Sequence, residues 1–170
     1  MPISKPTLHM MCGNIASGKS TLTARLASHP NTIVTAEDAW LHQLYGDQLQ
    51  TPADFMRCAA LLRQVIAPHV ISLLQAGVSV VLDFQANTVK SRAWMKTILD
   101  QCDADHTLHV LDVPAAVCAA RLRARNAKGD HPFQVTEAQF WQVAKYLVQP
   151  TEDEGFKIVR HGSNAAPQTQ

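Results

Sequence analysis

Excess charge of either sign is what this sequence most clearly lacks. The 170 residues include 15 basic and 14 acidic ones, which gives a formal net charge of +1. Proteins that bind duplex nucleic acid usually carry a basic excess, so this balance argues against nucleic acid as a partner. A hydrophobic fraction of 46% is normal for a globular chain and too high for a disordered one. The length fits one domain of ordinary size.

Cysteine is also scarce, and its spacing gives no metal site. The chain has four cysteines, with no Cys-x-x-Cys pair and no Cys/His cluster at zinc-ligand spacing. We expect reduced, mostly buried side chains. They are Cys12, Cys58, Cys102 and Cys118.

Hydrophobic runs long enough to span a bilayer are missing. The longest, at residues 65–77, is interrupted by Pro68, His69 and Gln75. The first six residues contain no apolar signal core. We therefore expect a soluble cytoplasmic protein, with no membrane partner, that is a monomer or a homodimer.

Short apolar runs alternate with helical patterns along the chain. The predicted strands are 7–12, 31–35, 78–83, 106–112 and 156–161. The predicted helices are 19–28, 36–45, 53–75, 88–102, 114–126 and 136–148, and 127–135 is expected to be a loop. Pro68 should kink or split the third helix.

This alternation predicts an α/β fold. A parallel sheet should be covered by helices on both faces, with right-handed crossovers. We expect one domain over residues 1–161 and a small, polar, disordered tail over 162–170. Ligands of such sheets bind at the carboxyl ends of the strands, so informative residues should follow each strand.

The first predicted strand runs directly into a phosphate-binding loop. Residues 13–20 fit the pattern G-x-x-x-x-G-K-[ST] in full, between a strand and a helix. In such a loop consecutive backbone N–H groups and a helix N-terminus face the phosphates. The predicted nucleotide-binding residues are Gly13, Asn14, Ile15, Ala16, Ser17, Gly18, Lys19, Ser20 and Thr21.

Individual side chains of this loop have distinct expected roles. Lys19 should reach the β- and γ-phosphates, and the Ser20 hydroxyl should bind Mg²⁺. Thr21 should bond the α-phosphate. Since no Asn-Lys-x-Asp guanine-reading motif occurs in the chain, we expect ATP rather than GTP.

Carboxylates follow the second and third predicted strands. Asp83 ends the apolar run Val80–Leu82, a pattern typical of a Walker B element that helps to hold Mg²⁺. A kinase also needs a carboxylate opposite the γ-phosphate to deprotonate the acceptor hydroxyl. Asp38 is the candidate base and Glu37 the alternative, and both could instead only favour their helix N-terminus.

Arginines on a later helix are candidates for phosphate binding and catalysis. Arg121 and Arg125 are four residues apart and share one helix face, whereas Arg123 points elsewhere. Two guanidinium groups on one face can clamp phosphates and stabilise charge on the transferring phosphoryl group. A solvated basic face is the alternative.

Other residues near strand ends are candidates for acceptor binding. Phe84 and Gln85 directly follow the third predicted strand, and Arg92 lies early on the next helix. Together with Glu37 and Asp38 they make up the expected acceptor side.

Motifs along most of the chain resemble those of a known group. They are the P-loop, 37–41, 81–84, Arg92, 111–114, 121–126, 135–136 and 150–156. In these segments the chain resembles the bacterial P-loop kinase-like ATP-binding proteins, often filed under AAA-type ATPases. Relatives in the wider class include chloramphenicol phosphotransferase, gluconate kinase, zeta toxin and the kinase domain of polynucleotide kinase.

The resemblance covers about residues 7–161 and implies a three-layer P-loop fold. The implied sheet order is 2-3-1-4-5, with a mobile lid around residues 121–132. It also implies Asp38 as base, Lys19, Arg121 and Arg125 on phosphate, and Ser20 with Asp83 on Mg²⁺. By the same resemblance, Arg121 is able to stack on adenine.

These patterns predict a kinase that moves the γ-phosphate of Mg·ATP to a hydroxyl of a small metabolite or antibiotic. The alternatives are a kinase of nucleic acid ends or nucleotide-sugars, and a nucleotide-binding regulatory ATPase that acts through a protein partner. A pure switch needs no base at the acceptor position, so Asp38 distinguishes these hypotheses.

Overall fold

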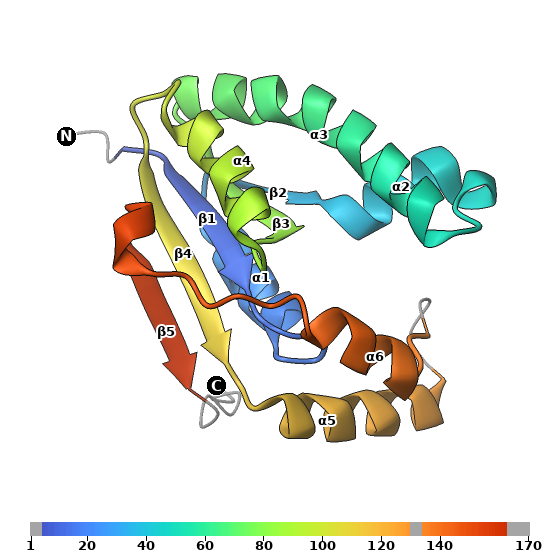
Figure 1. The fold of residues 1–170 in the computed structure, drawn as a ribbon. Coiled ribbons are helices and arrows are strands. Elements are labelled where there is room, and N and C mark those ends of the chain that lie inside the picture. The colour runs from blue at the N-terminus through green and yellow to red at the C-terminus, as the bar shows by residue number, and fades with distance from the viewer. Residues whose placement is uncertain (1–4, 130–133, 163–170) are drawn as a thin grey trace.

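The predicted sheet is present in the computed structural model, which describes residues 5–129 and 134–162 (Figure 1). The five strands are all parallel, in the order β2-β3-β1-β4-β5. They are β1 (Thr7–Cys12), β2 (Thr32–Ala36), β3 (Ser79–Gln85), β4 (Asp105–Asp112) and β5 (Ile158–Gly162). The α/β fold class and the strand order are thereby confirmed.

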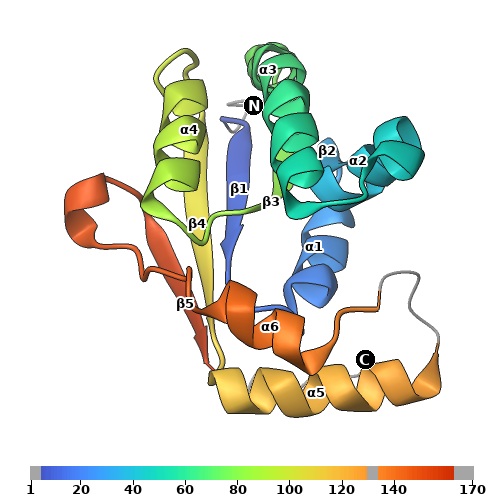
Figure 2. The same ribbon diagram turned by 45° about the vertical axis from the view of Figure 1, so that its right-hand side comes forward.

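The helices are arranged around this sheet. They are α1 (Lys19–Ala27), α2 (Glu37–Tyr45), α3 (Pro52–Gln75), α4 (Val89–Leu99), α5 (Ala115–Lys128) and α6 (Glu137–Ala144), with 3₁₀ turns at Gly46–Gln48 and Glu152–Glu154. In Figure 2, α3 and α4 lie on one face of the sheet, and α5 and α6 cross below the carboxyl ends of the strands. Helix α1 covers the opposite face.

Local sequence explains where several helices begin. Thr51 and Thr136 form capping boxes with Asp54 and Gln139, so two backbone N–H groups of each helix end are satisfied reciprocally. Thr88 caps α4 by accepting a hydrogen bond from the Ser91 N–H at 3.1 Å, as predicted.

Helix α3 differs from its prediction at Pro68. Of the two predicted outcomes, a kink or a split, the split is wrong because the helix is continuous through this residue, while α3 curves visibly in Figure 1. Proline removes the N–H that would bond the Gln64 carbonyl. Both residues lie on the exposed side of α3, where water can satisfy that carbonyl.

Several predicted boundaries also move. Strand β3 runs to Gln85, two residues beyond its prediction, and α5 extends to Lys128 into the predicted loop. Helix α6 ends at Ala144 rather than at 148, and Gly162 belongs to β5 rather than to a tail. Residues 130–132 of the predicted lid, residue 133 of the predicted loop and residues 163–170 of the predicted tail lie outside the described residues.

The main core lies between the sheet and α3 with α4. Its strand residues include Leu8, Met10 and Val80, all fully buried, and α3 contributes Leu62 and Ile66. By length and composition α3 could cross a bilayer, but buried residues along it belong to this core, as in a core helix of a globular protein. The four cysteines are free, and three of them are buried, as expected.

A chain of histidines crosses the sheet on the α1 face. Nδ1 of His9 lies 3.1 Å from Nε2 of His109, and Nδ1 of His109 lies 3.0 Å from Nε2 of His161. Burial lowers the pKa of His109 to about 4, with His9, His161 and Arg25 adding to the effect. Each contact needs one ring nitrogen as donor and the other as acceptor, so the folded state favours neutral rings.

This histidine chain predicts acid sensitivity. As pH falls from about 6.5 to 4, His109 binds a proton in the unfolded state but stays neutral in the folded state. The free energy of unfolding therefore falls over this range, by about 3 kcal/mol at most. Replacing His109 with glutamine should flatten the decline of melting temperature between pH 7 and 4.5. The exposed His69→Gln variant is the control. If the melting temperatures of His109→Gln and wild type declined equally with pH, His109 would not be the source of the acid sensitivity.

Candidate functional site

The predicted nucleotide site lies at the carboxyl ends of the strands. The P-loop follows β1, Asp38 lies two residues after β2, and Asp83 lies near the end of β3, where it pairs with Ala36. Strand ends are where an open parallel sheet binds its ligands. The fold therefore gathers residues that are up to 70 positions apart in sequence.

Glycines of the P-loop are required by its geometry. A Cβ at Gly13 would lie 2.7 Å from Ser17 Oγ and 3.1 Å from Leu111 Cβ, so any other residue there would force these neighbours to move. Gly18 has φ of +103°, and Ala16 has a φ of 61°, so the chain turns through left-handed conformations before α1. Such a turn directs successive N–H groups toward one point.

Asn87 fixes the start of the loop and was not predicted. Its Oδ1 accepts from the Gly13 N–H at 2.8 Å, and its Nδ2 donates to the Gly13 carbonyl at 3.0 Å. Asn87 lies two residues beyond β3 and is buried. Its position just after a strand was the only signal in the sequence.

Lys19 lies inside the loop. Its Nζ donates to the carbonyls of Gly13 and Asn14, both at 2.6 Å. Burial lowers the pKa of Lys19 to about 8, and the negative charges of Asp83 and Asp38 oppose that shift. Burial removes water that would stabilise the Lys19 ammonium, and the negative charge of a phosphate placed here would stabilise it instead.

Buried polar atoms around the loop fit a polyphosphate. No side chain caps the N-terminus of α1, so its first N–H groups are open to a ligand. Among the residues that the structure describes, five buried side-chain atoms lack a hydrogen-bond partner, namely Ser17 Oγ, Thr23 Oγ1, Thr35 Oγ1, Arg125 Nε and Asn126 Oδ1. Ser17 Oγ and Arg125 Nε belong to predicted phosphate-binding residues, and as donors they could bond a phosphate.

Asp83 and Ser20 are the residues that would hold Mg²⁺. Burial raises the pKa of Asp83, Asp38 raises it further, and Lys19 opposes both. Within the described residues no group of three or more His, Cys, Asp or Glu side chains could hold a metal by itself.

Asp83 yields a direct prediction. Asp83→Asn keeps the shape of the side chain and removes its charge, so activity should require about tenfold more Mg²⁺. The measurement is a Mg²⁺ titration of ATP turnover, with the exposed Asp112→Asn as control. A titration that matches wild type would make Asp83 a structural residue.

The two candidate bases have different surroundings. Glu37 is buried and accepts a hydrogen bond from Arg63 Nε at 3.1 Å, and burial raises its pKa while Arg63 opposes the shift. Both residues line a cavity of about 150 Å³ beside the P-loop, but Asp38 is exposed. The geometry thus favours Asp38 as the residue that meets an acceptor. A larger open hollow of about 360 Å³ along residues 42–48 contains none of the predicted site residues.

The candidate arginines lie on an element that packs against the P-loop. Helices α5 and α6 share a hydrophobic cluster, formed by residues such as Leu122 and Phe140, against which Ile15 and Ala16 pack. Arg121 is exposed on α5, while Arg125 is half-buried. The helix that carries Arg121 and Arg125 therefore packs against the loop whose phosphates these arginines are predicted to bind.

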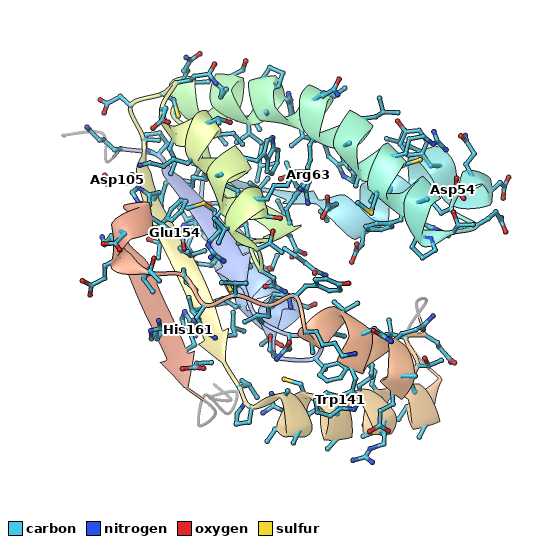
Figure 3. All side chains as sticks on the ribbon, viewed as in Figure 1. Asp54, Arg63, Asp105, Trp141, Glu154 and His161 are labelled. Atoms are coloured by element: carbon cyan, nitrogen blue, oxygen red, sulfur yellow. The ribbon has the colours of Figure 1, made fainter. Side chains whose placement is uncertain are left out.

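Two acceptor-side predictions are corrected by the structure. Arg92 is fully buried, and both its Nε and Nη2 donate to Glu154, at 2.6 and 2.9 Å (Figure 3 labels Glu154). Its Nη1 donates to the carbonyls of Ala86 and Val148, so Arg92 joins chain segments and does not reach the acceptor side. Phe84 is buried in the core, with its ring centroid 5.4 Å from that of Trp94. Gln85 does line the cavity.

Comparison with known proteins gives a family and a fold. The model of AAA_33, described as an AAA domain, matches residues 8–150. No curated protein matches the sequence significantly.

Several solved structures share the fold at low sequence identity. A candidate kinase from Chloroflexus aurantiacus has a TM-score of 0.74 at 17% identity, over 98% of this chain and 90% of that one. A sugar kinase from Janibacter has a TM-score of 0.65 at 16% identity, over 96% of this chain and 88% of that one. The APS kinase of Mycobacterium tuberculosis, solved with AMPPNP and APS, has a TM-score of 0.61 at 17% identity, over 96% of this chain and 91% of that one.

Proposed function

Because the chain belongs to the AAA_33 family of AAA domains and has the fold of P-loop kinases, we propose that it transfers the γ-phosphate of Mg·ATP to a hydroxyl of a small molecule. The observation that carries the proposal is the position of Asp38. It lines a cavity that Asn87 also lines, and Asn87 is bonded to the first residue of the P-loop. An acceptor in that cavity would therefore sit next to the phosphates and next to a carboxylate.

The proposed chemistry assigns a role to each group. Asp38 orients the acceptor hydroxyl and accepts its proton as the oxygen bonds to the γ-phosphorus. The bond from that phosphorus to the β–γ bridging oxygen breaks, and ADP leaves. Lys19 and Arg125 stabilise negative charge on the transferring group. Ser20 and Asp83 would hold Mg²⁺, which would supply further charge neutralisation.

The electrostatic coupling of these residues supports the proposal. The pKa of Lys19 responds to Asp83 and Asp38, and that of Asp83 responds to Asp38 and Lys19. Groups interact in this way only when they are close and poorly screened by water. Free cysteines are consistent with a cytoplasmic location, which is part of the proposal.

The experiment is an acceptor panel. The full chain is incubated with Mg·ATP and sets of metabolites and antibiotics that carry hydroxyl groups, and products are analysed by mass spectrometry. We expect ATP turnover to rise with a true acceptor, which gains the mass of one phosphate. Steady ATP hydrolysis that no acceptor stimulates would instead favour a regulatory ATPase. Transfer only to nucleic acid ends would overturn the small-molecule acceptor.

A further inference from the structure

The chain between β3 and α4 bonds the first residue of the P-loop. Asn87 lies two residues after β3, and its carboxamide bonds both polar groups of the Gly13 backbone, the N–H at 2.8 Å and the carbonyl at 3.0 Å. Just before it, the Ala86 N–H donates to the Met11 carbonyl at 2.8 Å. A carboxamide offers a donor and an acceptor, as a peptide group does. Asn87 therefore continues the pairing of β1 with β3 beyond the end of β3.

The Gly13 carbonyl is shared between two side chains. It accepts from Asn87 Nδ2 at 3.0 Å and from Lys19 Nζ at 2.6 Å. A carbonyl oxygen has two lone pairs, so these two donors use its full capacity. The orientation of this peptide group helps to determine where the Lys19 ammonium lies, and Asn87 fixes that orientation.

Hydrogen bonds hold the main chain of Asn87 as well as its side chain. Asn87 is buried, and its carbonyl accepts from the Val148 N–H at 2.8 Å. Nη1 of Arg92, in the first turn of α4, donates to the carbonyls of Ala86 and Val148, at 2.9 and 2.8 Å. The guanidinium therefore bridges the same two chain segments that the Asn87 carbonyl joins.

Arg92 is itself held by a carboxylate. It is fully buried, and Glu154 accepts from its Nε and Nη2 at 2.6 and 2.9 Å (Glu154 is labelled in Figure 3). These hydrogen bonds lower the pKa of Glu154, so the pair is charged at neutral pH. A bidentate pair fixes direction as well as distance, and opening it would leave a buried charge without its partner. The support of Asn87 is therefore rigid.

The supported segment also leads to the predicted phosphate-binding arginines. Val148 lies four residues after the end of α6. Helix α6 shares its hydrophobic cluster with α5, which carries Arg121 and Arg125. Asn87 thus bonds both the P-loop and the chain that leaves this helix pair.

We propose that Asn87 is a positioning residue for nucleotide binding. Its carboxamide sets the polar groups of Gly13, and through them the Lys19 ammonium, in the arrangement that receives the phosphates. Without the carboxamide, the Gly13 N–H loses its partner and the loop gains conformations that bind phosphate poorly. The inference rests on the nucleotide binding that is part of the proposed function, and it does not depend on the acceptor.

The first test is isothermal titration of the full chain with Mg·ADP, which has no γ-phosphate to transfer. We expect Asn87→Ala to raise the Kd about tenfold, as fits the loss of the bonds to Gly13. Ile98→Val trims a buried core residue at the far end of α4 and is the control for lost stability. Its melting temperature should fall while its Kd matches that of wild type. A folded Asn87→Ala protein with unchanged Kd would make Asn87 merely structural and would overturn the inference.

Asn87→Asp adds a readout that packing alone would not move, the pH profile of the Kd. A protonated carboxyl group has a donor and an acceptor, as the amide does, whereas an ionised one has no donor for the Gly13 carbonyl. The ratio of its Kd to that of wild type should be about tenfold or more near pH 8 and should approach one near pH 5.5, because burial favours the protonated form. Dividing by wild type removes the titration of the nucleotide and of other groups.

The two variants together separate the donor from simple charge repulsion. Asn87→Ala has no carboxyl group at this position, so its ratio to wild type should not improve at low pH. Recovery of Asn87→Asp only to the level of Asn87→Ala, or a ratio that does not change with pH, would contradict the role of the amide donor. If Asn87→Ala does not fold, recovery of Asn87→Asp to the affinity of wild type decides the question.

Failure of the inference can be told apart from failure of the proposed function. A wild-type protein that binds Mg·ADP, with variants at Asn87 that bind it equally well, would defeat the inference alone. A wild-type protein that does not bind nucleotide would defeat both.

Discussion

Replacing Lys19 with alanine is expected to abolish productive Mg·ATP binding, with affinity reduced about a hundredfold or more, as fits the loss of charge-assisted bonds to phosphate. The Lys19 ammonium is the cation inside the P-loop, held by the Gly13 and Asn14 carbonyls. Without it the loop offers only N–H groups and the end of α1 to a highly charged ligand.

The fold should tolerate this change. Lys19 contributes no packing to the core clusters, and its burial already disfavours the charged form. We expect the melting temperature without nucleotide to change by only a few degrees, since lost hydrogen bonds are offset by relief from burying a charge.

The measurement is isothermal titration with Mg·ATP alongside thermal melting. Lys157→Ala, which removes an exposed lysine next to β5, is the matched control and should bind as wild type does. A folded Lys19→Ala protein with unchanged affinity would show that the motif does not bind nucleotide here.

Asp38→Asn is expected to reduce acceptor phosphorylation by about a hundredfold or more, within the usual range for general-base catalysis. The change removes the base while leaving the P-loop and Asp83 intact, so ATP affinity should survive. Phosphoryl transfer and ATP binding are measured separately on the same preparation.

Glu37→Gln is the informative comparison for the base. Successive helix residues point about 100° apart, so one of the two carboxylates faces the γ-phosphate and the other does not. In the structure both residues line the cavity, but Glu37 is buried and bonded to Arg63, whereas Asp38 is exposed. Glu37→Gln should therefore affect phosphoryl transfer far less. If Glu37→Gln lost phosphoryl transfer while Asp38→Asn retained it, Glu37 would be the base.

Local patterns predicted those parts of the molecule that depend on neighbouring residues. The P-loop was visible because its spacing, the preceding strand and the following helix lie within about 20 consecutive residues. Asp83 was visible because an apolar strand ends near it. The sheet order followed from the resemblance to P-loop kinases, and the structure confirms it.

Features that depend on distant pairing escaped prediction. Arg92 was expected on the acceptor side because it follows a strand end, but its partner Glu154 lies 62 residues further on. The bonds of Asn87 to Gly13 span 74 residues, and the histidine chain joins three different strands. No local periodicity carries such information. The different surroundings of Glu37 and Asp38 likewise depend on Arg63, which lies on α3.

Following the γ-phosphate itself tests phosphotransfer most directly. The full chain is incubated with Mg²⁺, γ-radiolabelled ATP and a small-molecule extract, and the labelled products are separated and identified. We predict that label appears on an organic hydroxyl compound, and that Lys19→Ala and Asp38→Asn each suppress that product. Label recovered only as inorganic phosphate, at the same rate with and without the extract, would contradict a small-molecule kinase and favour a regulatory ATPase.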